Sequence, residues 1–144
     1  MPRSATSDSV RSQLPGAVAL ALAGAGLWWG WFAWDTQRSI DPATGSETGP
    51  YEVWQVAGCV LSWIVLAWIG VRMLRPPLVA LVLPAAFTAA FALTGAGSDD
   101  SGLWAVGAVL VALGSFAGTA VLVLLLRRPA APSRRRAEPA GSPR

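Results

Sequence analysis

The chain has 144 residues, of which 53% are apolar and only 13% charged, and its mean hydropathy is +0.49. Soluble domains carry about 25% charged residues, so we expect most of this chain to lie in lipid. The net charge of +3 rests on eleven arginines and no lysine; these flank apolar runs and no groove-reading motif is present, which favours a membrane surface and excludes nucleic acid as the partner.

The residue inventory also restricts the chemistry. Histidine is absent and Cys59 is the only cysteine, so one chain cannot form a disulfide, a redox cysteine pair or a His/Cys metal site. Catalysis that depends on histidine or lysine is excluded on the same ground. We therefore expect no enzyme and no cofactor, with Cys59 packed as a small buried hydrophobe.

The first apolar run follows a polar segment, residues 1–14, which we expect to be a cytoplasmic tail. From Pro15 to Trp34 every residue is apolar or glycine, and these twenty residues can cross the ~30 Å hydrocarbon core. A cleaved signal peptide is the alternative, because arginines precede the run and small residues occupy 23–25. The run continues well past that triplet, which favours a membrane span.

A polar loop, residues 35–51, separates the first two spans. The carboxylates in and beside this loop fit no calcium-binding pattern, so we expect no metal site there. We expect residues 35–49 to fold back over the outer end of the bundle, with Ile40 resting on the nearby tryptophans and Arg38 beside a carboxylate. A disordered connector is the alternative.

The second span is expected over residues 52–74. Its start carries helix-entry chemistry, with Gly49 as N-cap, Pro50 at the first helical position and Glu52 at the third. Pro76-Pro77 blocks continuation at the other end. A connection this short predicts an antiparallel hairpin between the second and third spans.

The third span, residues 77–94, is predicted to be the shortest and to be kinked by Pro84. Thr88 lies one turn further on, where its hydroxyl can bond the backbone of its own helix. The fourth span is expected over residues 102–126. The remaining residues, 127–144, are rich in proline and arginine and poor in apolar side chains, so we expect a disordered basic tail.

The arginine distribution predicts the orientation. With both termini and the turn after the second span in the cytoplasm, ten of the eleven arginines lie inside and only Arg38 lies outside. The predicted fold is thus all-α, a polytopic four-transmembrane-helix bundle spanning residues 15–126. It is placed in the inner (plasma) membrane as a multi-pass protein with both termini cytoplasmic.

Aromatic residues gather toward the predicted outer face. The four tryptophans of the first span point in different directions around a helix, so at least one should pack inward against the second or fourth span, or under the loop. An interfacial aromatic belt and a pocket for a lipid or hydrophobic ligand are the two interpretations. The candidate outer-face residues are Trp28, Trp31, Trp34, Arg38, Asp41, Glu47, Tyr51, Glu52 and Trp54. The candidate lipid-surface residues are Arg127, Arg128, Arg134, Arg135 and Arg136.

Small and hydroxyl residues supply the remaining motifs. Two GxxxG patterns, residues 26–30 and 114–118, are expected to bring helices together within the chain, with a homodimer face or no role as alternatives. Ser62, Ser115 and Thr119 are expected to bond their own helix backbone rather than a substrate.

The string DPATGSETGPYEVWQVAGC, residues 41–59, follows a tryptophan-rich span and precedes a span that ends in a short Arg-Pro turn. In these features the chain resembles small four-helix integral membrane proteins of actinobacteria, a group of unknown function. The resemblance implies no activity and assigns no functional residue.

Between the interfacial positions of the four spans there is no Asp, Glu, Lys, Arg or His, and this absence decides between function classes. Ion-coupled transporters keep such a residue within the bundle, so we expect a non-catalytic protein that acts through lipids, other membrane proteins or a homodimer. The alternative is a small transporter or flippase-accessory subunit for a lipid-like or uncharged solute. Transport would require polar side chains to converge on a cavity, and the candidates are Gln55, Ser62, Thr88, Ser115 and Thr119.

Overall fold

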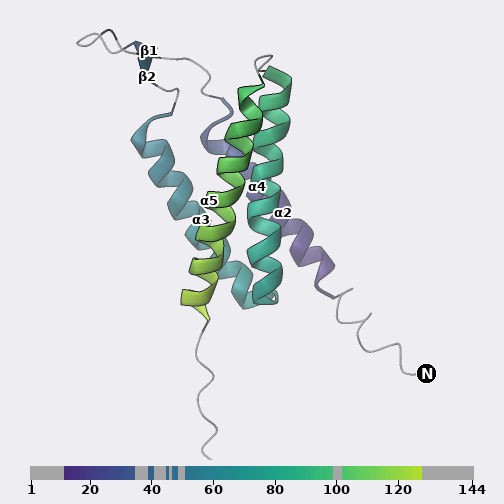
Figure 1. Cartoon of the computed structure of the whole chain (residues 1–144). Coiled ribbons are helices and arrows are strands. Elements are labelled where there is room, and N and C mark those ends of the chain that lie inside the picture. The colour runs from purple at the N-terminus through teal and green to yellow at the C-terminus, as the bar shows by residue number, and fades with distance from the viewer. Residues whose placement is uncertain are drawn as a thin grey trace, which may run out of the picture.

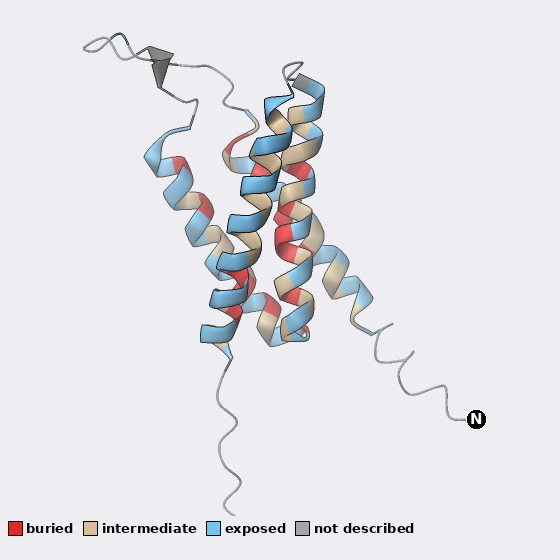
Figure 2. Ribbon diagram, in the orientation of Figure 1, coloured by how far each residue is buried: buried red, intermediate tan, exposed pale blue. Residues whose placement is uncertain are grey.

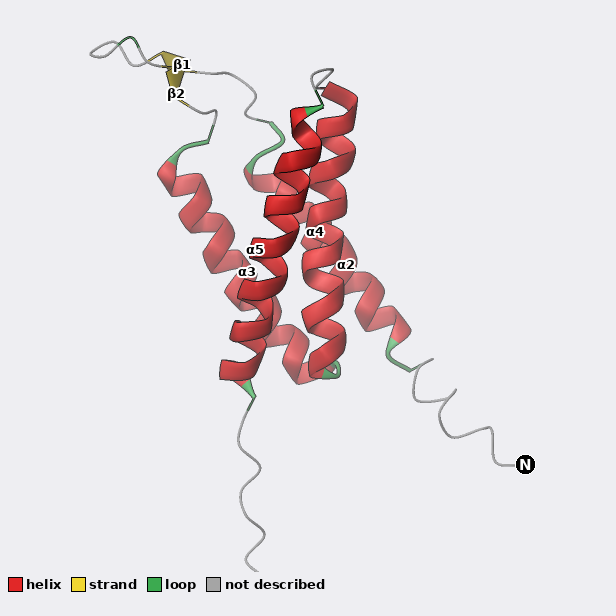
Figure 3. Ribbon diagram, in the orientation of Figure 1, coloured by secondary structure: helices red, strands yellow, loops and turns green. Residues whose placement is uncertain are grey.

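The computed structural model describes residues 12–34, 39–40, 45, 47–48, 51–98 and 102–127. Four helices account for most of this part of the chain (Figure 3). They are α2 (Leu14–Trp31), α3 (Val53–Met73), α4 (Pro76–Ser98) and α5 (Leu103–Leu126). All four are long and apolar enough to cross a membrane, which confirms the predicted set of four candidate spans.

The helix ends differ in places from those predicted. The first helix stops at Trp31, three residues before Trp34, and its last turn closes with the Phe32 N–H donating to Trp28 O at 2.9 Å. The third helix continues to Ser98 and has 23 residues, so it is not the shortest; α2 is, with 18. α4 thus includes Gly95, where a Cβ would lie 2.9 Å from the Trp104 Cβ, so glycine allows α5 to pack close to the end of α4.

The start of α3 corrects the predicted cap. Glu52 itself is the N-cap, in an extended conformation, and Gln55 is the third helical residue. Gln55 Oε1 accepts the Glu52 N–H at 2.6 Å, half of a capping box, and its side chain is fully buried. The helix thus begins at Val53, later than Pro50 would have set it; Gly49 and Pro50 lie outside the described residues.

The helices form an up-and-down bundle that is open on one side (Figure 1). The most extensive contacts join α2 to α4 and α4 to α5, and α3 packs mainly on α2. α3 and α4 lie close together near the short turn before Pro76, as predicted for a hairpin. Toward its N-terminal end, α3 diverges from α5. The bundle therefore parts between α3 and α5.

Two buried clusters hold the helices together. One lies toward the α3–α4 turn and consists of Leu20, Ala67, Leu74, Val79, Leu83 and Val123. The other lies toward the start of α3 and consists of Leu27, Trp28, Phe32, Cys59, Phe87 and Ala90. Cys59 is buried in apolar surroundings, as predicted. Elsewhere, large apolar side chains are exposed over the outer surface of the helices (Figure 2), as expected where lipid is the solvent.

The close helix approaches occur at glycines outside the GxxxG patterns. A Cβ on Gly24 would lie 3.1 Å from the backbone oxygen of Leu83, and one on Gly58 would overlap the ring of Trp31. In contrast, nothing among the described residues lies within 4 Å of a Cβ at any of the four GxxxG glycines. The prediction that these patterns bring helices together within the chain is wrong, because their glycines face outward or into the opening beside α3.

The described residues between α2 and α3 include one short strand pair. β1 (Ser39–Ile40) and β2 (Glu47–Thr48) are antiparallel, with Ser39 opposite Thr48. Figure 1 shows this pair beyond the N-terminal end of α3 and away from α4 and α5. The two strands bond to each other rather than cover the bundle, so the expectation that the loop folds back does not hold for them; the side chains of Arg38 and Ile40 lie outside the described residues.

Candidate functional site

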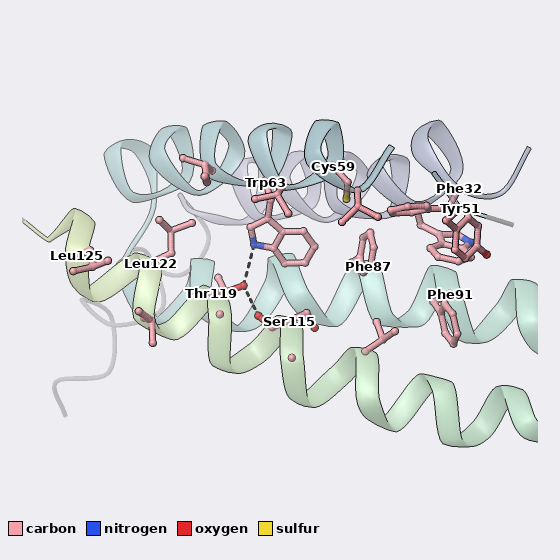
Figure 4. Close-up of a pocket in the computed structure, with 18 residues that line it drawn as sticks. Phe32, Tyr51, Cys59, Trp63, Phe87, Phe91, Ser115, Thr119, Leu122 and Leu125 are labelled. Carbon is pink, nitrogen blue, oxygen red and sulfur yellow. Dashed lines mark hydrogen bonds between the residues drawn. The ribbon is translucent and has the colours of Figure 1, made fainter. Parts of the chain in front are cut away.

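A groove runs between α3 and α5, with α4 as its floor (Figure 4). It encloses about 640 Å³. Its edges are exposed apolar side chains, among them Val60 on α3 and Leu125 on α5, so it opens along the flank of the bundle. The described residues that line it include no Asp, Glu, Lys, Arg or His.

Aromatic rings close the end of the groove nearest Tyr51. The Trp28 ring centroid lies 4.8 Å from that of Phe91 and 5.9 Å from that of Phe87, both on α4. It also lies 5.4 Å from Phe32 and 6.0 Å from Tyr51. Inward packing of a tryptophan against the second or fourth span was predicted and is confirmed by Trp31, whose ring packs on Gly58 of α3. The more deeply buried Trp28 packs mainly on α4, because α4 is the main neighbour of α2.

Trp63 crosses the groove from α3 to α5. Its indole Nε1 donates a hydrogen bond to Thr119 Oγ1 at 3.0 Å, and its ring stands edge-on to Phe87 with centroids 5.0 Å apart. Thr119 is only 1% exposed. Trp63 therefore ties α3 to α5 and stands between the aromatic end of the groove and an aliphatic end lined by Leu122 and Leu125 (Figure 4).

Two tryptophan–threonine hydrogen bonds share one arrangement, in which the threonine hydroxyl accepts from the indole and donates to a carbonyl of its own helix. Thr119 Oγ1 donates to the Ser115 carbonyl at 2.6 Å, one turn earlier in α5, and this leaves its lone pairs for the indole. Trp28 Nε1 likewise donates to Thr94 Oγ1 at 3.0 Å, and Thr94 donates to the Ala90 carbonyl at 2.9 Å. Each threonine bonds its own helix, as predicted for Thr119, and links that helix to a second one.

Comparisons of the chain with protein families, with curated proteins and with solved structures found no match.

The other hydroxyl groups are also engaged locally. Ser62 donates to the Gly58 carbonyl at 2.8 Å and Ser115 to the Ala112 carbonyl at 3.2 Å, both as predicted. Thr88 is different, because its hydroxyl pairs with that of Ser115 across α4 and α5 at 3.4 Å rather than with its own backbone. Among the described residues, no buried side-chain nitrogen or oxygen lacks a partner. Of the five polar candidates, only Ser115 and Thr119 line the groove, and both donate to carbonyls of their own helix.

The predicted outer-face residues separate into three sets. Trp28 and Tyr51 line the groove. Trp31 packs on Gly58, and its ring centroid lies 6.1 Å from that of Trp54. The Trp54 centroid is in turn 6.4 Å from that of the exposed Trp34, and none of these three rings nor Glu52 lines the groove. The side chains of Arg38, Asp41 and Glu47 lie outside the described residues.

The predicted lipid-surface arginines are described only in part. Arg127 directly follows α5 and is exposed. Arg128, Arg134, Arg135 and Arg136 lie outside the described residues.

Sequence reasoning missed the residues at the middle and floor of the groove, chiefly Trp63, Phe87 and Phe91. Trp63 carried a usable signal, because it sits in the middle of the 21-residue α3 whereas tryptophans of an interfacial belt sit near helix ends. A mid-span indole needs a hydrogen-bond partner within the bundle. The two phenylalanines carried no such signal, since apolar residues surround them on all sides of α4.

Proposed function

We propose that this chain is a non-catalytic membrane protein that associates with membrane lipid and holds an acyl chain in the groove between α3 and α5. The observation that carries the proposal is the opening of this groove along the flank of the bundle, between exposed apolar edges. Its volume of about 640 Å³ falls within the ~300–1,000 Å³ typical of small-ligand sites.

The dimensions of the groove suit a lipid chain. On α5 its lining extends from Val111 to Leu125, which corresponds to about 21 Å at ~1.5 Å per residue. Half of a ~30 Å hydrocarbon core is about 15 Å, so the groove is long enough for the chain of a lipid in one leaflet. The two open glycines of the lining, Gly114 and Gly118, leave room against the α5 backbone.

The polar groups favour association over transport. Ser115 and Thr119 are the hydroxyl residues of α5 that line the groove, and both donate to carbonyls of their own helix. A solute that needed hydrogen bonds would have to displace these or the Trp63 indole, whereas an acyl chain needs none. The sequence also places no ionisable residue within the spans apart from Arg72 near the end of α3, so a coupling residue is missing.

The proposal is tested with a phospholipid that carries a photoreactive diazirine on its acyl chain, mixed with the full chain in nanodiscs. After illumination, labelled residues are mapped by mass spectrometry. We expect the label to concentrate on groove residues, such as Val60, Ile64 and Leu125, relative to exposed residues of α2 such as Val18 and Leu22. Equal labelling of both sets would contradict a specific site.

A matched pair of variants separates occupancy from random collision. Gly118 and Gly26 both have open space where a Cβ would project, but only Gly118 lines the groove. Gly118→Phe should fill the groove and abolish the preferred labelling, and Gly26→Phe should leave it unchanged. If a helix of another chain occupies the groove instead, the wild type will show protein–protein crosslinks through a photoreactive residue at position 121 and no preferred lipid label.

A further inference from the structure

Two smaller apolar clefts flank the first turns of α4, at the end of the bundle opposite the buried aromatic rings around Trp28. One, of about 360 Å³, lies between α2 and α4, and the other, of about 330 Å³, lies between α4 and α5. Pro77 and Leu81 line both. Because these two residues are four apart on a helix, they form one ridge with a cleft on each side.

Each cleft has an arginine in its lining. Arg75, in the turn before α4, belongs to the cleft beside α2, and Arg127, directly after α5, belongs to the cleft beside α5. Both arginines are exposed, and the rest of each lining is apolar except for Gln13. An apolar slot with a guanidinium at the membrane-surface end matches a phospholipid, whose chains are apolar and whose phosphate is anionic.

The start of α4 offers little else to an anion. Pro76 and Pro77 have no N–H, and the next two N–H groups, of Leu78 and Val79, already donate to the Arg75 carbonyl at 2.9 and 3.3 Å. The backbone donors that usually bind anions at a helix N-terminus are therefore missing or used. A phosphate over the ridge is therefore bound by side chains, and the linings of the two clefts offer Arg75, Arg127 and the amide of Gln13.

We infer that one anionic diacyl phospholipid straddles the start of α4, with one acyl chain in each cleft and its phosphate between Arg75 and Arg127. The similar volumes of the two clefts fit two chains of similar size. Because Pro77 and Leu81 line both clefts, the two slots are adjacent, as the two chains of one lipid require. This site is separate from the groove between α3 and α5, and shares no residue with it.

The chain supplies a matched control for the charge. Arg72 lies at the same end of the bundle but stacks over the Trp68 ring, with its Cζ 4.6 Å from the ring centroid, and lines neither cleft. Arg72→Gln therefore removes the same charge as Arg75→Gln or Arg127→Gln without touching the site. Leu81→Trp is the complementary variant. It keeps every charge, and from its exposed position the larger side chain takes up space in the clefts.

The experiment is native mass spectrometry of the delipidated full chain with phosphatidylglycerol, with phosphatidylcholine of the same chains, and with inorganic phosphate. Circular dichroism confirms helicity for every variant. We expect one retained phosphatidylglycerol, weaker binding of phosphatidylcholine, and no retained phosphate. Arg75→Gln and Arg127→Gln should each weaken phosphatidylglycerol binding about fivefold, Leu81→Trp should weaken it at least as much, and Arg72→Gln should leave it near the wild-type value.

Four results would overturn the inference: equal loss in the Arg72→Gln control, equal binding of the zwitterionic lipid, retention of phosphate alone, or unchanged binding in Leu81→Trp. Two retained lipids, each lost with one arginine, would show two separate sites instead of one lipid across the ridge.

Discussion

At the scale of single residues, threonine links tryptophan to a neighbouring helix in two places. A buried indole N–H without a partner is costly in hydrocarbon, where no water can replace the bond. Thr94 and Thr119 solve this because one hydroxyl donates to its own helix and accepts from the indole at the same time. The donor and acceptor capacity of a single oxygen thus holds two helices together.

The Trp63–Thr119 bond is predicted to stabilise the bundle by about 1 kcal/mol, within the range measured for side-chain bonds between membrane helices. Trp63→Phe and Thr119→Val each remove one partner while keeping most of the volume. Reversible unfolding in mixed micelles gives the free energies for a double-mutant cycle, and the double variant should lose less than the sum of the single losses.

Ser62→Ala is the control for that cycle, because Ser62 bonds only the Gly58 carbonyl of its own helix. The loss of unfolding free energy in Ser62→Ala should be small, and it should add to the loss caused by Trp63→Phe. Fully additive losses for Trp63→Phe and Thr119→Val would show that the bond contributes nothing.

At the scale of helices, the sequence predicts where the spans lie and fails to predict which faces meet. Prolines and polar residues mark most helix ends, and the α3–α4 turn follows directly from Pro76. On α5, however, apolar residues point in every direction around the last two turns, so the apolar pattern does not distinguish buried Val123 from exposed Leu124 and Leu125. The groove could not be predicted for this reason, because it depends on the angle at which α3 leaves α5.

The contact between α2 and α4 should depend on Gly24. A methyl group there would press on the backbone oxygen of Leu83, which cannot rotate away, whereas Gly26 on the same helix faces open space. Alanine gains the same helix propensity at either position, so the difference between the two variants reports packing alone. Gly24→Ala should be less stable than Gly26→Ala by about 1 kcal/mol, as for other overpacked cores.

Unfolding of both variants in the same micelles measures this difference, and distance measurements between spin labels on α2 and α4 show whether the helices separate. Equal stabilities of the two variants would mean that α2 can shift at no cost in free energy. The contact of α2 with α4 would then be looser than the 3.1 Å between a Cβ on Gly24 and the Leu83 oxygen implies.

At the scale of the whole molecule, the start of α2, the α3–α4 turn and the end of α5 lie at one end of the bundle (Figure 1). The arginines at 72, 75 and 127 belong to this end. The opposite end carries the buried cluster around Trp28 and the start of α3. This segregation fits the predicted orientation, in which the arginine-bearing end faces the cytoplasm.

The orientation is predicted to place both termini in the cytoplasm. In cells that express a Cys59→Ala background, Ser133→Cys should resist a membrane-impermeant thiol reagent until the cells are lysed, and Thr44→Cys in the first loop should react in intact cells. Labelling of the Ser133→Cys variant from outside would reverse the assignment. Reporter enzymes fused after Arg128 give an independent readout.

The contact between α2 and α4 has a consequence for the order in which the helices can assemble during synthesis. α2 is synthesised before α3, yet the helix that α2 contacts most extensively, α4, is synthesised after both. Until Thr94 has been synthesised, the Trp28 indole has no bundle partner and is best satisfied by water near the headgroups. We therefore expect an intermediate of biosynthesis in which α2 and α3 are inserted and Gly24 faces lipid, and in which the contacts of α2 with α4 form only after α4 is inserted.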